Sequence, residues 1–221
     1  MKKILILVLL LLASVPALPQ LQTVIKGGPI YMKIFESEGN TGRHAETSTP
    51  KPSMFFALAF RYRTHMFNMG GELEYTRRTY HFDTEHGGVS GYTGYSLDVA
   101  VNQLRIDLEP QFTFGKKVKI FIYPGIYAGY NIHSTVTGTS SYSGSGGHYD
   151  ENIDEAVPQK WEYGVLLGFG IDIPMRKGFT FVFENMESLN LSDLVPIRFA
   201  SFYILDIRFS AGIAYTFGNK P

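Results

Sequence analysis

The chain has 221 residues, equal numbers of acidic and basic side chains, and no cysteine. Zero net charge argues against a polyelectrolyte partner such as nucleic acid, and the lack of cysteine excludes disulfides, thiolate metal sites and thiol nucleophiles. The length suffices for a single domain with a sizeable interior.

Residues 1–17 have the pattern of a cleaved secretory signal peptide. Lys2 and Lys3 precede an apolar run over residues 4–12, and Val15 and Ala17 suit a cleavage site after Ala17. The run is too short to cross a bilayer as a helix, which disfavours the alternative of an N-terminal anchor helix. No cysteine follows it, so a lipid-anchored N-terminus is also disfavoured. We therefore expect residues 18–221 to be exported as one domain.

Eight segments of this exported part alternate apolar and polar residues with the period of two that β-strands show. In segment 117–133, KVKIFIYPGIYAGYNIH, the even positions are almost all apolar, and the odd ones are polar, glycine or aromatic. The first segment has an ambiguous phase, in which Ile30, Met32 and Ile34 suggest the apolar face. The predicted strands cover residues 23–36, 54–63, 67–80, 102–114, 117–133, 161–173, 179–187 and 203–217.

The connections between these strands alternate in length. Those over residues 64–66, 115–116 and 174–177 are short, and the long ones are predicted over residues 37–53, 83–95, 135–160 and 188–198. Short turns at one end and long polar loops at the other are typical of outer-membrane barrels, with the short side in the periplasm. This order predicts that both chain termini are periplasmic.

The two faces of each strand indicate which solvent surrounds the barrel. Only a closed sheet satisfies its backbone in hydrocarbon, so the apolar stripes are expected to face lipid, with aromatic residues at their ends. A soluble, lipocalin-like barrel would reverse the faces and bury the charges against a ligand. The polar stripes carry both acidic and basic residues, which favours a lumen filled by oppositely charged side chains that form ion pairs. The predicted lumen charges are Arg61, Arg63, Glu72, Glu74, Arg78, Arg105, Asp107, Glu109, Glu162, Asp172, Glu184, Asp206 and Arg208.

The fold class predicted is therefore all-β, an eight-stranded antiparallel up-and-down transmembrane β-barrel. The interior of a barrel of this size is just wide enough for side chains, so a wide pore is not expected.

With these strands placed, the chain resembles the PorT-like outer-membrane β-barrel family of small barrels, known mainly from Bacteroidetes. The resemblance rests on NQLRIDLEPQFTFGKKVKIFIYPGIYAGY, on GVLLGFGIDIP and on the closing FSAGIAYTFG. Asp107 stands where the family often has proline. The resemblance implies outer-membrane location, and the aromatic last strand, which ends at Phe217, is similar to the signal that barrel-assembly machinery recognises. One member of the family is needed for protein secretion, but no residue of this chain indicates that it has the same role.

Three observations bear on chemistry. The six histidines show no metal-ligand spacing. The acidic loop predicted over residues 148–155, HYDENIDE, could hold Ca²⁺ or bridge to lipopolysaccharide, or could simply be solvated. An enzyme would need a rim-sited constellation, for which the candidates are His81, Asp83, Glu85, His86, His133 and Ser134.

These patterns favour a non-enzymatic barrel without catalytic, cofactor or metal residues. Its extracellular loops would serve adhesion, ligand binding or support of an envelope complex. Its expected partners are membrane lipid, lipopolysaccharide, the barrel-assembly machinery during insertion and an unidentified surface or envelope partner. The alternatives are an outer-membrane hydrolase or acyltransferase and a narrow channel for protons or ions, since ionisable groups inside a membrane are often functional.

Overall fold

The computed structural model describes residues 20–36, 44–63, 67–88, 91–144, 147–155, 161–192 and 202–217. The signal peptide predicted over residues 1–17 lies outside this part of the chain. No helix among the described residues is both long enough and apolar enough to cross a bilayer. The elements are β1 (Gln20–Glu36), β2 (His44–Pro50), β3 (Ser53–Arg63), β4 (Phe67–Gly88), β5 (Gly91–Phe114), β6 (Lys119–Gly144), β7 (Gly147–Glu155), β8 (Trp161–Pro174), the short 3₁₀ turn η1 (Arg176–Gly178), β9 (Phe179–Asn190) and β10 (Phe202–Thr216).

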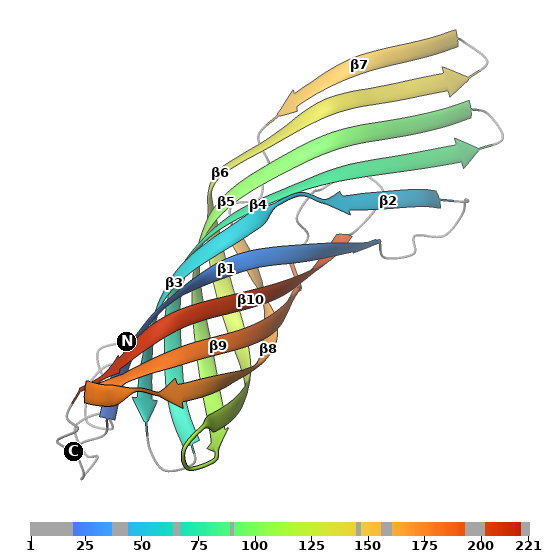
Figure 1. The fold of residues 1–221 in the computed structure, drawn as a ribbon. Helices are drawn as coiled ribbons and strands as arrows, with labels where there is room; N and C mark the ends of the chain where they lie inside the picture. Colours follow the sequence, from blue (N-terminus) through green and yellow to red (C-terminus); the bar gives the residue numbers. More distant parts are fainter. Residues whose placement is uncertain are drawn as a thin grey trace, which may run out of the picture.

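Eight of these strands close into an antiparallel barrel, as predicted (Figure 1). The order around the barrel is β1, β3, β4, β5, β6, β8, β9 and β10, and the pairing of β10 with β1 completes the ring. Closure removes the free edges of the sheet, so the backbone polar groups of the wall are satisfied within it. The start of β1, the end of β10 and η1 lie at one end, which we call the turn end.

The loops predicted over residues 37–53, 83–95 and 135–160 are largely wrong, because much of this sequence forms strands. The β4–β5 ladder continues without a break from Phe67 paired with Phe112 to Gly88 paired with Gly91. β2 pairs with the far part of β4, and β7 pairs with the far part of β6. The acidic segment 148–155 therefore lies in strand β7 and is not a loop.

These far parts form a five-stranded sheet in the order β2, β4, β5, β6 and β7. Figure 1 shows it extending beyond the barrel, away from the turn end. We call it the distal sheet. Its β5 and β6 segments are rich in Ser, Thr and Tyr, and the β-branched and aromatic members of that set favour strands even where no membrane surrounds them.

Large apolar side chains cover the outside of the barrel. Ile120 and Leu108, for example, are 57% and 52% exposed, whereas Arg105 and Asp206 are buried inside. Aromatic pairs mark two levels on this wall: Phe67 packs on Phe112 near the turn end, and Tyr130 packs on Trp161 near the distal sheet. Exposed apolar surface between two aromatic levels is the pattern of a wall in contact with lipid.

The apolar face suggested for the first strand, whose phase was ambiguous, is wrong at Ile30 and Met32, and the side chain of Ile34 lies outside the described residues. Ile30 and Met32 are buried inside the barrel, and Ile25 and Tyr31 point outward. The reason is that the interior is apolar at this level. Ile30 and Met32 belong to a buried cluster that we call the apolar plug, which also contains Phe55, Ala57, Tyr80, Leu97, Val99, Val101, Val136 and Ile204.

Candidate functional site

Below the apolar plug, the barrel interior holds a network of ionisable side chains. The inward positions of each strand alternate with the lipid-facing ones, so every second residue can contribute. All the predicted lumen charges point inward; Arg63 is half-buried and the others are buried. They divide into a group near the turn end and a group nearer the plug.

The group near the turn end is centred on Lys26, which the sequence did not single out. Its ammonium lies 2.6 Å from a Glu72 oxygen and 2.5 Å from a Glu184 oxygen. Arg61 donates to Glu184 at 2.9 Å and approaches Asp172 at 3.4 Å. Three strands, β1, β4 and β9, thus meet at one ammonium. Lys26 could have been found from its spacing: it follows Gln22 by four residues, so both side chains lie on the same face of β1.

The group nearer the plug is centred on Arg78. Its two terminal nitrogens lie 2.9 and 2.5 Å from the two carboxylate oxygens of Glu162, a bidentate pair across the barrel. Gln103 donates to Glu162 at 2.9 Å, and the Tyr127 hydroxyl donates to it at 3.2 Å. Asp206 lies 3.5 Å from Arg78, which links this pair to the next one.

Two further arginines complete the network. Arg208 contacts Asp206 at 3.1 Å and pairs with Glu74. Arg105 donates to Asp107 at 2.6 Å, and its guanidinium lies 3.7 Å from the centre of the Tyr127 ring. A buried charge must be paired and hydrogen-bonded to be tolerated, and most of the network meets that requirement.

Glycines on the inner face of β8 make room for aromatic side chains from β6. A Cβ atom at Gly168 would overlap the Tyr123 ring, and one at Gly170 would overlap the Phe121 ring. Tyr123 in turn donates a hydrogen bond to Glu184. The small residues therefore allow aromatic side chains and charges to fill the lumen together, as expected for eight strands.

Several carboxylates lie close enough to share a cation. Oxygens of Glu72, Glu74 and Asp107 lie within 4.8 Å of one another, as do oxygens of Glu72, Glu109 and Glu184. In the second group, Glu72 and Glu184 contact the Lys26 ammonium. In the first, Asp107 is paired with Arg105 and Glu74 with Arg208. Protein cations thus already neutralise much of the charge of both groups.

The rim candidates are only partly brought together. His81 lies on the outer face of the distal sheet, with Nδ1 2.8 Å from Asp98 and Nε2 3.1 Å from Asp83. Hydrogen bonds from Lys51 and His81 hold the pKa of Asp98 below its ordinary value. Among the described side chains, no hydroxyl is hydrogen-bonded to His81. His133 is exposed on β6, and the side chains of Glu85 and His86 lie outside the description.

A closed antiparallel barrel with an apolar outer wall and a charged interior defines the class of outer-membrane β-barrels. The model of the family described as outer membrane protein beta-barrel domain matches residues 20–194. The chain belongs to this family and is an integral outer-membrane protein.

Solved structures with a similar fold share little sequence with the chain. Ail of Yersinia pestis, solved with the heparin analogue sucrose octasulfate, is 14% identical, with a TM-score of 0.45 over 90% of this chain and 100% of Ail. OprG from Pseudomonas aeruginosa is 12% identical, with a TM-score of 0.48 over 91% and 98%. The Escherichia coli protease OmpT is 8% identical, with a TM-score of 0.44 over 92% and 99%. No curated protein matches the chain.

Proposed function

We propose that this outer-membrane barrel is a non-conducting, non-enzymatic anchor that presents the distal sheet to a binding partner at the cell surface. The observation that carries the proposal is the contrast between a filled interior and a long sheet beyond it. The charged network and the apolar plug occupy successive levels of the lumen, and the five-stranded distal sheet extends past the plug. Surface adhesion, ligand binding or support of an envelope complex would each use this sheet.

The proposed orientation places the turn end in the periplasm and the distal sheet outside the cell. Support comes from the long connections, which all leave the barrel at the end of the distal sheet, as in other outer-membrane barrels. Export would depend on residues 1–17 acting as a signal peptide. We also place the chain with the PorT-like barrels, on the segments NQLRIDLEPQFTFG and FSAGIAYTFG.

Purified chain reconstituted in planar bilayers is expected to give no stable single-channel current. Most of the charged groups below the plug are held in ion pairs, and the plug above them fills the lumen with apolar side chains such as Val99 and Val136. An ion entering the plug would lose its hydration without gaining polar ligands, and an ion entering the charged level would have to displace existing ion pairs. Stable current steps from the folded chain would contradict the closed lumen and would support the narrow channel instead.

The distal sheet is expected to contact other macromolecules in living cells. A photo-reactive amino acid at Tyr142, which is 47% exposed on the far part of β6, should give discrete crosslinked species. The matched control is Ile126 on the same strand, which is similarly exposed but faces lipid. Crosslinks at Ile126 and none at Tyr142, in cells where both variants are inserted, would contradict a binding role for the sheet.

The hydrolase alternative has one favourable observation, the contact of His81 with Asp98. An acid–base pair needs a nucleophile or an activated water in a sheltered site, and His81 lies on the open outer face of a sheet. Loss of a lipid- or peptide-cleaving activity on His81→Ala, with insertion unchanged, would favour the enzyme over the binding barrel.

A further inference from the structure

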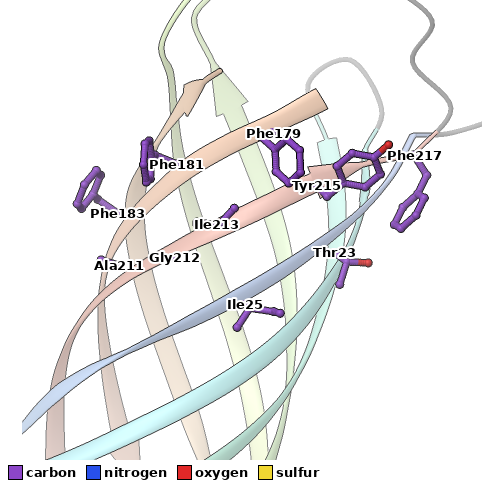
Figure 2. Close-up of a pocket in the computed structure, with 10 residues that line it drawn as sticks. All are labelled: Thr23, Ile25, Phe179, Phe181, Phe183, Ala211, Gly212, Ile213, Tyr215 and Phe217. Carbon is purple, nitrogen blue, oxygen red and sulfur yellow. The ribbon is translucent and has the colours of Figure 1, made fainter. Parts of the chain in front are cut away.

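An apolar groove runs along the outer wall of the barrel near the turn end. Its volume is about 740 Å³, within the range of roughly 300–1,000 Å³ that is usual for ligand pockets. It lies over β9, β10 and β1, and its lining is almost entirely apolar (Figure 2). Because this wall faces lipid, the material available to fill the groove is hydrocarbon.

The groove arises from a difference in side-chain size between neighbouring strands. Phe179, Phe181 and Phe183 project in a row from β9 (Figure 2). On β10, Ala211 pairs with Phe183 of β9 on one side and with Gly27 of β1 on the other. Because its side chain is small, Ala211 forms the floor of the groove beside the row of phenylalanines. Tyr215 packs against Phe179, with ring centres 5.1 Å apart, and closes the end of the groove.

Two exposed cations lie at that closed end. Arg176 and Lys177 belong to η1, directly before Phe179, and the Met175 N–H donates to the Phe179 carbonyl at 2.8 Å to close the turn. A Cβ atom at Gly178 would lie 3.4 Å from the Tyr215 ring, so the turn packs on the residue that ends the groove. An elongated apolar groove thus leads to a pair of positive charges at the membrane surface.

The apolar groove and the two cations suit the acyl chain and the head group of one lipid molecule. An acyl chain that moves from the bilayer into the groove stays in hydrocarbon, so it gains packing contacts but no hydrophobic driving force. Selectivity must therefore come from the head group. Arginine and lysine bind phosphate strongly, and basic residues at a membrane surface attract anionic lipids.

We infer that the groove binds an acyl chain of an anionic glycerophospholipid, with its phosphate held by Arg176 and Lys177. The choice of a phospholipid over lipopolysaccharide rests on the proposed orientation, which places the groove in the periplasmic leaflet. The site would hold one lipid in a fixed place against the β10–β1 closure of the barrel.

Native mass spectrometry of the folded chain in detergent tests this assignment with phosphatidylglycerol, phosphatidylcholine and lipid A as probes. Arg176→Gln combined with Lys177→Asn should weaken phosphatidylglycerol binding by about fivefold for each charge removed. Asparagine is chosen because Lys177 has a φ of 63°, in the left-handed region that asparagine tolerates. The control is Lys116→Gln with Lys117→Gln, which removes two exposed charges from the β5–β6 turn.

A second pair of variants tests the groove itself. Ala211→Leu should fill its floor and weaken phosphatidylglycerol binding, whereas Ala128→Leu, at an equally outward position on β6, should not. The inference would be overturned if test and control variants lost the same phosphatidylglycerol affinity. It would also be overturned if the unmodified chain bound phosphatidylcholine as tightly as phosphatidylglycerol, or bound lipid A more tightly. Because the assay uses detergent and no surface partner, its failure would leave the proposed function of the distal sheet unaffected.

Discussion

Replacement of Arg78 by methionine is expected to lower the free energy of unfolding in lipid vesicles by about 3–5 kcal/mol. The substitution removes both hydrogen bonds of the bidentate pair and leaves the buried Glu162 carboxylate without its main counter-charge. A buried charge without a partner is among the most destabilising local changes known in proteins. Urea unfolding can be followed by the fluorescence of Trp161, the only tryptophan of the chain.

Two comparisons separate lost pairing from lost packing. Arg77→Met, at the adjacent outward position, should change the free energy of unfolding by no more than about 0.5 kcal/mol. The double variant Arg78→Met with Glu162→Met should recover most of the stability, because replacing both partners of a buried pair is often neutral. A double variant as unstable as the single one would show that Arg78 acts through packing instead of charge.

Leu108→Arg is expected to destabilise the inserted barrel by about 2–4 kcal/mol, the cost of an arginine on the lipid face at the bilayer midplane. Leu108 is 52% exposed on β5, in a row of outward apolar side chains. It lies midway between Leu104, which pairs with Tyr130 of one aromatic level, and Phe112 of the other. The same urea titration in vesicles measures the change.

The matched control for the lipid face is Thr137→Arg on β6. Thr137 is exposed beyond the aromatic level at Tyr130, where outward side chains are polar, so arginine there should cost no more than about 1 kcal/mol. Similar costs at both positions would place Leu108 in water and would remove the physical basis for a membrane-spanning wall.

The barrel was predictable because most charges of its central strands share one face. Arg105 and Asp107 alternate with Leu104, Ile106 and Leu108, and only a lipid environment leaves the apolar row outside. β1 lacked this signal. Apolar residues lie on both faces of β1, because the barrel interior beside it changes from charged at Lys26 to apolar at Ile30. The alternation of residues along one strand does not indicate such a change.

The distal sheet and the detailed pairings required the structure. The mostly polar segments of β2, HAETSTP, and β7, GHYDENIDE, resemble loop sequence, and their strand conformation depends on pairing with β4 and β6. The partner of a charge is likewise set by strand order and register: Arg78 and Glu162 are 84 residues apart. The alternation along each strand could place both residues in the lumen, but only the closed barrel brings them together.

Spin-label accessibility tests the central claim, that lipid surrounds the barrel and the charges lie within it. Because the chain has no cysteine, Leu108→Cys and Thr137→Cys each provide one labelling site. In vesicles the label at Leu108 should collide readily with dissolved oxygen and rarely with a water-soluble nickel chelate, and the label at Thr137 should show the reverse. Nickel collisions at Leu108 as frequent as those at Thr137 would contradict the account.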